Sequence, residues 1–351
     1  MTRFAWLQSK AQTLVVAGLL AALAITTGIT GVHLSHLYHQ LVAPCIATNS
    51  CGLAMDEFFR HYSFLQNALM FLLRIAPALI GIFWGGPLIA RELETGTYRL
   101  AWTQTVSRQR WVLTKLAFVG GTAVLVAGVL TLTITWWYRA LDSTNDSMWG
   151  VFDARDIVPI GYTFFAFMLG ALLGAIIRRT VPAMAASLGV FVFARIAVQQ
   201  WVRPHLLSPL HLTSSLANAG FGFASSGGGP VDLVVKAAGP RGSWVLTSQL
   251  VDHSGHAPTF AERTAFVAHY CPAIARVPNE KAAGHPIPAP QGVQDAVNTC
   301  QEQAARTFHV LVTYQPASHY WPFQWLELGV YVLLGLFAAG LCFWWVTKRI
   351  T

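Results

Sequence analysis

Charged side chains that could carry chemistry are concentrated in one short segment. Only 11% of the 351 residues are charged. Residues 85–115 nevertheless join two apolar stretches and contain Arg91, Glu92, Glu94, Arg99, Arg108, Arg110 and Lys115. Basic residues at the end of an apolar stretch favour the cytoplasmic side of a membrane. A connector that only orients its flanking helices is therefore the simplest interpretation of this segment.

The same segment contains signals for the ends of helices. Gly96 suits the left-handed turn that ends a helix, and Ser107 can cap the next one by accepting a hydrogen bond from a free backbone N–H. Between them, the apolar side chains of residues 98–102 could form a short helix at a membrane surface. The pattern predicts two long helices joined by a short one.

Two further arginines, Arg74 and Arg195, lie inside apolar stretches. At about 1.5 Å per residue, each is about 10 Å from the outer end of its stretch. An unpaired charge at that depth costs a few kcal/mol. A structural role would require either side chain to extend towards the headgroups or to pair with Glu327.

Other groupings of reactive residue types are weaker candidates. Asp252, His253 and Ser254 are the three residue types of a hydrolase triad, but triad members act from positions spread through a fold, and no G-x-S-x-G elbow accompanies them. The histidines at 33, 36 and 39 could share a helical face, but a polar helix end explains them, so we predict no metal. The sequence has no G-x-x-x-x-G-K-[ST] phosphate loop. We therefore predict that this chain is not an enzyme and holds no cofactor.

The composition indicates an integral membrane protein. Apolar residues make up 54% of the chain and its mean hydropathy is +0.48, whereas about a quarter of the residues in soluble domains are charged. The net charge of +8 does not predict a nucleic-acid partner, because the basic residues are not gathered on one stretch of a soluble domain. Crossing a bilayer takes about 20 helical residues. Six stretches qualify: 12–34, 67–90, 113–137, 157–177, 181–203 and 324–346. The first could be a cleaved signal peptide, but its apolar character continues past any cleavage site.

The basic residues predict the orientation of these helices. With a cytoplasmic N-terminus, the inner segments hold Arg3, Lys10, Arg91, Arg99, Arg108, Arg110, Lys115, Arg178, Arg179, Lys348 and Arg349. The two short outer loops hold only Arg60, Arg139 and Arg155. This bias predicts that both termini are cytoplasmic.

Four cysteines fall in segments predicted to be outside, where disulfides persist. We expect Cys45 to pair with Cys51 and Cys271 with Cys300, although spacing alone does not fix connectivity. Residues 204–323 are too polar and long for a connection and predict a small α+β extracytoplasmic domain. The predicted organisation is helices 1 to 5 in residues 1–203, this domain in 204–323, and helix 6 with the C-terminus in 324–351. The membrane part is predicted to be all-α.

Three blocks of the chain resemble bacterial ABC transporter permeases of the drug-export type, particularly an actinobacterial group. They are PLIARELETGTYRLAWTQTVSRQRWVLTK, FAFMLGALLGAIIRRTVPAMAASLGVFVFARIAVQ and YQPASHYWPFQWLELG. The large segment after helix 5 resembles the type V, G-subfamily arrangement. The resemblance covers all the membrane helices but says little about residues 204–305.

The resemblance implies a role for the charged segment. In such permeases the short helix between membrane helices 2 and 3 fits a groove of a separate ATP-binding subunit. Glu92 and Gly96 match the E-x-x-x-G element of that helix, with Glu92 facing a basic residue of the ATPase. The implied coupling segment is 91–112, with contacts from Arg91, Glu92, Glu94, Gly96, Thr97, Tyr98, Arg99, Gln104 and Arg108. ATP and Mg²⁺ would be bound by the partner.

The resemblance also implies the function of the whole chain. It would be the permease subunit of an ATP-driven exporter in a bacterial cell membrane, moving a hydrophobic or amphipathic small molecule outward by alternating access. A second permease copy, or a homologous permease, would complete the pathway, and Arg74 and Arg195 would border it. The alternatives are a membrane receptor or sensor whose outer domain binds a ligand, and, third, an integral-membrane enzyme.

Overall fold

The computed structural model describes residues 2–42, 44, 52–97, 107–142, 148–216, 220–224, 230–236, 239–272 and 291–349. The chain divides into two compact units. The helical unit comprises Met1–Leu206 and Tyr320–Thr351, and the inserted unit comprises Leu207–His319. Cys45 and Cys51, and therefore their predicted disulfide, lie outside the described residues.

Six helical segments in the described part of the chain are long and apolar enough to cross a membrane. They are Gly18–Gln40, Ser63–Thr95, Arg108–Tyr138, Met148–Ile177, Thr180–His205 and Ala317–Arg349. Each overlaps one of the six predicted stretches, so the prediction of a polytopic helical membrane protein is confirmed.

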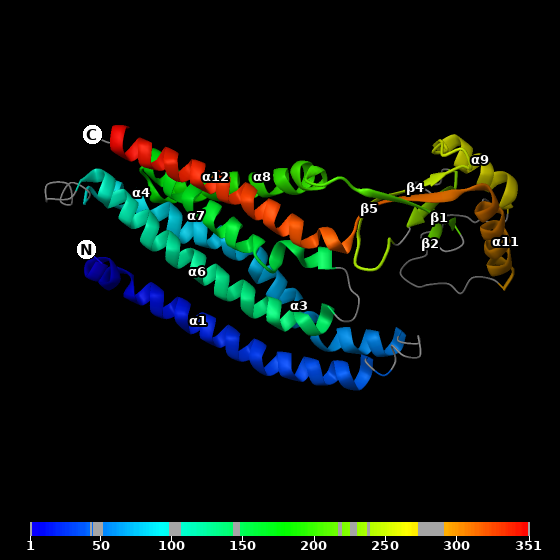
Figure 1. Cartoon of the computed structure of the whole chain (residues 1–351), viewed down its shortest axis with the longest axis horizontal. Coiled ribbons are helices and arrows are strands. Elements are labelled where there is room, and N and C mark those ends of the chain that lie inside the picture. The colour runs from blue at the N-terminus through cyan, green and yellow to red at the C-terminus, as the bar shows by residue number, and fades with distance from the viewer. Residues whose placement is uncertain are drawn as a thin grey trace. The chain divides into compact units, whose positions relative to one another are not determined.

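The helical unit is built from long helices interrupted by short turns of other helix types. Its elements are α1 (Thr2–Leu37), η1 (Tyr38–Val42), α3 (Gly52–Ile80), η2 (Gly81–Gly85), α4 (Gly86–Thr95), α6 (Arg108–Asp142), η3 (Met148–Ala154), α7 (Val158–Ile177), α8 (Thr180–Ala197), η4 (Val198–Val202), η5 (Arg203–His205) and α12 (Tyr320–Arg349). Figure 1 shows the start of α1, α4 and the end of α12 at the same end of this unit.

Helix α7 lies at the centre of the helical unit and packs against α12, α4, α6, α8 and α3. It has apolar residues on all faces and no charged side chain, a composition typical of a helix surrounded by protein. Glycines permit the closest approach: a Cβ at Gly170 or Gly174 would collide with the backbone of Gly81 or Gly86.

The second membrane helix changes its winding where it passes α7. Pro77 lies inside α3 and has no N–H to donate; the π-helical turn η2 follows at Gly81–Gly85. Helix α4 then continues the span and ends at Gly96, which has φ 72°. This is the left-handed conformation, which glycine adopts without a steric penalty. The predicted helix end at Gly96 is therefore confirmed.

The inserted unit contains two antiparallel sheets, two α-helices and the 3₁₀ turn η7 (Ala317–His319) among its described residues. One sheet has the order β1 (Leu210–Ser215), β5 (His309–Gln315), β4 (Trp244–Val251); the other pairs β2 (Gly220–Ala224) with β3 (Asp232–Lys236). In the first sheet Leu210 is opposite Tyr314, and Val251 is opposite His309. The helices are α9 (Phe260–Tyr270) and α11 (Gln291–Thr307), and this mixture of strands and helices is consistent with the predicted α+β domain.

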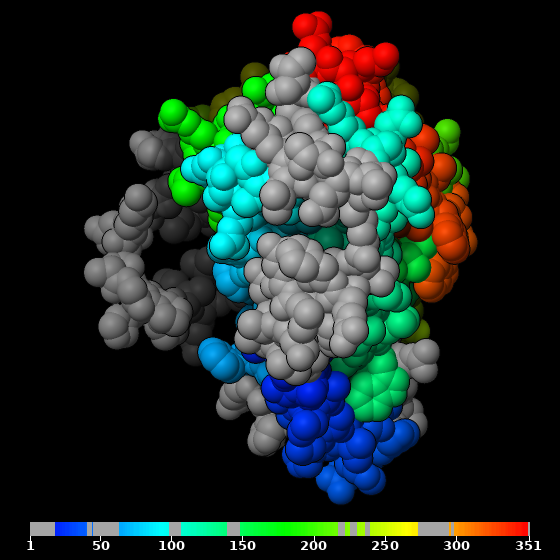
Figure 2. All heavy atoms as spheres, turned by 90° about the vertical axis from the view of Figure 1, so that its left-hand side faces the viewer, coloured from blue at the N-terminus to red at the C-terminus, as the bar shows by residue number. Residues whose placement is uncertain are grey.

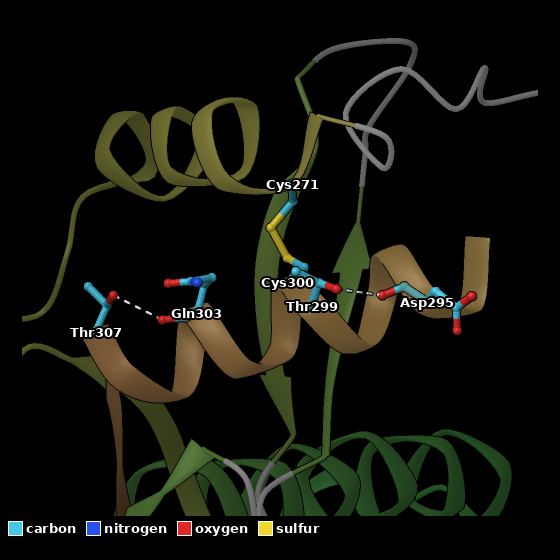
Figure 3. Close-up of a disulfide and its surroundings, with 6 residues drawn as sticks. All are labelled: Cys271, Asp295, Thr299, Cys300, Gln303 and Thr307. Atoms are coloured by element: carbon cyan, nitrogen blue, oxygen red, sulfur yellow. Dashed lines mark hydrogen bonds between the residues drawn. A yellow bond between two sulfur atoms is a disulfide. The ribbon is translucent and has the colours of Figure 1, made fainter. Parts of the chain in front are cut away.

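A disulfide joins Cys271, directly after α9, to Cys300 in α11 (Figure 3). Both cysteines are buried in the core of the inserted unit, which includes Phe266, Val310 and Val312. The cysteines are 29 residues apart, and closing a loop of that length stabilises a fold by about 3.5 kcal/mol through the entropy of the unfolded chain.

The next long helix, α12, begins at Tyr320, four residues before the predicted stretch.

Candidate functional site

The charged segment begins at the end of α4, where two carboxylates bind neighbouring helices. Glu92 forms an ion pair with Lys115 of α6, and the Lys115 ammonium also lies 4.6 Å from the ring centroid of Trp111. The predicted basic partner of Glu92 was a residue of another subunit, so this pairing within the chain was not foreseen. It fixes the end of α4 against the first turns of α6.

Glu94 binds the start of α8. Its Oε2 atom accepts hydrogen bonds from the Thr180 backbone N–H at 3.0 Å and from the Thr180 hydroxyl at 2.7 Å. Arg179, the residue before α8, makes no capping hydrogen bond with its side chain, so Glu94 satisfies a free N–H that a local cap would normally bind. Glu92, Glu94, Lys115 and Thr180 together form what we term the hinge cluster.

Three arginines of the segment are exposed at the same end of the helical unit. Arg91, Arg108 and Arg110 are exposed, and Figure 2 shows residues of α4 (cyan), the start of α6 (turquoise) and the end of α12 (red) on this face. The predicted cap is confirmed, because Ser107 Oγ accepts a hydrogen bond from the Arg110 backbone N–H at 3.3 Å. Gly96 and Thr97 follow α4 directly, whereas Tyr98, Arg99 and Gln104 lie outside the described residues.

The two arginines predicted inside the spans meet at one carboxylate. Arg74 Nε lies 3.2 Å from Asp153 Oδ2, and Arg195 Nη2 lies 3.3 Å from the same oxygen. Arg74 also donates to the Gly150 carbonyl at 3.0 Å. The Arg195 guanidinium lies 3.6 Å from the ring centroid of Tyr162. Helices α3 and α8 are therefore connected through the 3₁₀ turn η3.

Glu327 of α12 binds a different arginine from those predicted. Arg203 Nε lies 2.7 Å from Glu327 Oε2, and Arg203 Nη2 lies 2.8 Å from Oε1. Tyr162 donates its hydroxyl to Oε1 at 2.5 Å. The two bonds from Arg203 to Glu327 form the bidentate geometry of strong arginine–carboxylate pairs. The predicted alternative, a pair between Glu327 and Arg74 or Arg195, is therefore wrong. Glu327 pairs with Arg203, which lies at the end of the fifth predicted stretch.

A further ion pair directly follows η3 in the chain. Arg155 Nε is 3.1 Å from Asp156 Oδ2, and Tyr320 donates its hydroxyl to the same carboxylate. Asp156 has φ 61°, and its backbone is bound by two threonines of α6: its carbonyl accepts from Thr131, and its N–H donates to Thr135. These bonds stabilise a conformation that is unfavourable for residues other than glycine.

Arg74, Asp153, Tyr162, Arg195, Arg203 and Glu327 together form what we term the arginine network. The sequence predicted Arg74 and Arg195 as site residues but not Asp153, Arg203 or Tyr162. Asp153, which the predicted stretches place in an outer loop, lies in the 3₁₀ turn η3, within the candidate span Met148–Ile177. The charge of Glu327 could have led to Arg203, because an acid inside a span requires a cation nearby. Arg203 lies just inside the boundary of its span.

In the inserted unit, the Asp252–Ser254 sequence forms a turn. Ser254 donates its hydroxyl to Asp252 Oδ1 at 2.6 Å, and the His256 Nδ1 lies 2.7 Å from the same hydroxyl. His253 instead contacts the Thr307 carbonyl through Nδ1. These hydrogen bonds from Ser254 and from the His256 backbone hold the pKa of Asp252 below its ordinary value. Within the described residues, no group of three histidine, cysteine or acidic residues could hold a metal ion.

Six apolar helices with ion pairs between them define a polytopic membrane protein. Residues 17–203, just over half of the chain, match the family model described as ABC-2 membrane transporter related. The chain therefore belongs to this family and is a membrane permease component of an ABC transporter, a class of protein that works with an ATP-binding subunit. No curated protein and no solved structure gave a significant match. The matched region contains the hinge cluster and all of the arginine network except Glu327.

Proposed function

We propose that this chain is the permease subunit of an ATP-driven exporter, similar to the type V, G-subfamily group and of actinobacterial type. It moves a hydrophobic or amphipathic small molecule out of a bacterial cell by alternating access, while a separate subunit hydrolyses ATP. The observation that carries the proposal is the hinge cluster: the end of α4 is bound to both α6 and α8. A force applied to this end of the unit would reach two further membrane helices.

The coupling segment is residues 91–112. Its contacts with the ATPase would come from Arg91, Glu92, Glu94, Gly96, Thr97, Tyr98, Arg99, Gln104 and Arg108. Glu92 and Glu94 also have partners within the chain. A contact between Glu92 and a basic residue of the ATPase therefore requires Glu92 to share or exchange Lys115. Such an exchange would link docking of the ATPase to the position of α6.

The arginine network marks the opposite end of the same helices. Thr180 and Arg195 are 15 residues apart in α8, which corresponds to about 22 Å along a helix. We place Arg74 and Arg195 beside the transport path, which a second permease copy or a homologous permease completes. Movement of α8 started at Glu94 would then change the surroundings of Arg195.

The proposed topology has both termini in the cytoplasm and the inserted unit outside. Support comes from the basic residues of the predicted inner segments, since such residues accumulate on the cytoplasmic side. A disulfide between Cys271 and Cys300 fits an oxidising compartment. The proposed domains are residues 1–203, 204–323 and 324–351, with a second outer disulfide between Cys45 and Cys51.

Purification from native membranes tests this function. The tagged full chain, solubilised in a neutral detergent, should carry with it a protein that contains a phosphate-binding loop, and the complex should hydrolyse ATP. Mass spectrometry identifies the partner, and an ATPase assay measures the activity. Repeated isolation of the chain without an ATP-binding protein would contradict the proposal and favour a receptor.

A further inference from the structure

The arginine network contains one positive charge more than it has acids to balance. Arg203 is paired with Glu327, so these two residues neutralise each other. Arg74 and Arg195 instead share the single carboxylate of Asp153. All three lie within segments long and apolar enough to cross a membrane, where an uncompensated charge is costly. The Arg74–Asp153–Arg195 group thus lacks one negative charge.

The same group also has an unused hydrogen-bond donor. Arg195 Nη1 is buried and has no hydrogen-bond partner among the described residues. Its neighbour Arg203 uses both Nε and Nη2 to bind Glu327. A buried donor without an acceptor costs free energy. An acceptor supplied from outside the chain would remove this cost.

The contacts with Asp153 are also longer than those of the complete pair. Asp153 lies 3.2 to 3.3 Å from the two arginines, whereas the Arg203–Glu327 distances are 2.7 and 2.8 Å. Ionic hydrogen bonds are strongest at the shorter distances. Asp153 is therefore the more readily displaced carboxylate of the two.

Apolar side chains lie beside both arginines. Phe71 precedes Arg74 by three residues in α3 and is 66% exposed, and Val192 precedes Arg195 by three residues in α8 and is 43% exposed. Residues three apart share a face of a helix. The Arg74 side chain is itself 45% exposed. A ligand with one anionic group and an apolar tail matches both features.

We propose that Arg74 and Arg195 form a binding site for the anionic group of an amphipathic molecule, such as a carboxylate, sulfonate or phosphate. Asp153 is the internal counter-ion that occupies the two arginines in the absence of a ligand. The site deepens the proposed function and rests on it only for the statement that the ligand is transported. A lipid headgroup and an exported amphiphile share this chemistry.

Binding is measured on the full chain in nanodiscs of neutral phosphatidylcholine, without an ATPase. The probe is octanesulfonate, titrated calorimetrically against the protein and against empty nanodiscs. We expect octanesulfonate to bind the protein saturably. Its cationic counterpart, octyltrimethylammonium, should not bind. Equal binding of the two probes would overturn the proposal without requiring any variant.

Substitutions then assign the site. Arg74→Gln and Arg195→Gln should each weaken octanesulfonate binding by about tenfold or more, because each removes an ionic hydrogen bond. Asp153→Asn should strengthen it, because the competing carboxylate is gone. Arg241→Gln, at an exposed arginine of the inserted unit, should leave the affinity unchanged. Unchanged binding in both network arginine variants, or weaker binding in Asp153→Asn, would overturn the proposal.

Phosphatidylglycerol distinguishes the two sources of the anion. If a lipid headgroup occupies the site, adding phosphatidylglycerol to the nanodiscs should reduce octanesulfonate binding in proportion to the fraction of this lipid. If the site takes an exported amphiphile, the affinity should stay as it was. Either result supports the anion site. Because no ATPase is present, failure of this experiment leaves the coupling role untouched, and failure to find an ATP-binding partner leaves this binding untouched.

Discussion

At the scale of single residues, the helical unit is stabilised by charges that are paired across helices. Arg203 and Glu327 are separated by 124 residues in sequence but form two hydrogen bonds, and both side chains are almost fully buried. A buried ion pair contributes modestly when complete, yet the loss of one partner is expensive. The identity of each partner is therefore testable by stability measurements.

Glu327→Ala should lower the free energy of unfolding by about 3–5 kcal/mol, because it leaves Arg203 buried without a counter-charge. The double variant Arg203→Met, Glu327→Leu should recover most of this loss, since no charge remains buried. Thermal unfolding of the purified chain, followed by tryptophan fluorescence, measures both. Glu302→Ala, at an exposed acid of α11, is the control. A double variant no more stable than Glu327→Ala would contradict the pairing.

A second prediction at the residue scale concerns acid pH. Thr259 and Glu262 form a reciprocal cap at the start of α9. Hydrogen bonds from Thr259 hold the pKa of Glu262 below its ordinary value of 4.5. A lowered pKa in the folded state means that Glu262 stabilises α9 fully above the ordinary value and that this contribution is lost as the pH falls through the folded value.

Hydrogen exchange of the α9 amides in the full chain measures this effect. Protection in the wild-type protein should decrease as the pH falls below about 4.5. In Glu262→Gln, protection should already be lower at pH 7 and should change less with acid. Identical profiles for the two proteins would show that the cap does not govern the stability of α9.

At the scale of elements, the sequence predicted the helices well and their interactions poorly. Length and apolar character were sufficient for six spans, and Gly96 and Ser107 marked two helix ends. The π-helical turn at Gly81–Gly85 lies where α7 approaches most closely, and no local sequence pattern predicted it. The contacts of Asp153 with Arg74 and Arg195 were not predicted, because they join residues that are distant in sequence.

The Glu94–Thr180 contact leads to a prediction about the coupling of α4 to α8. Glu94→Ala removes the acceptor for the N–H and hydroxyl of Thr180. We expect ATP hydrolysis by the complex to continue while transport per ATP falls severalfold, because α8 no longer follows α4. Glu94→Gln keeps a carbonyl acceptor and should retain most of the coupling.

Parallel assays of transport and ATP hydrolysis on the same reconstituted complexes provide this ratio. If the role of Glu94 is purely structural, Glu94→Ala should lower transport and ATP hydrolysis together with the amount of folded protein. An unchanged ratio in Glu94→Ala would show that the contact does not transmit movement.

At the scale of the whole molecule, the proposed coupling site at the hinge cluster and the proposed anion site at Arg74 and Arg195 lie at different ends of the helical unit. The exposed basic residues near Gly96 surround the first, and the incompletely balanced arginines form the second. The family match covers the helices that connect them. The composition alone was enough to predict a membrane protein, whereas the connection between the clusters required the three-dimensional contacts of Glu94 and Asp153.

We propose above all that this permease exports its substrate by means of a partner ATPase that acts on the charged segment. The most direct measurement is the accumulation of a fluorescent amphipathic dye in inside-out membrane vesicles that contain the chain and its ATP-binding subunit. We predict accumulation that requires ATP, is abolished by Arg91→Glu at the exposed surface of α4, and is unaffected by Arg241→Glu in the inserted unit. Accumulation without ATP, movement of dye out of the vesicles, or full activity of Arg91→Glu would contradict this account.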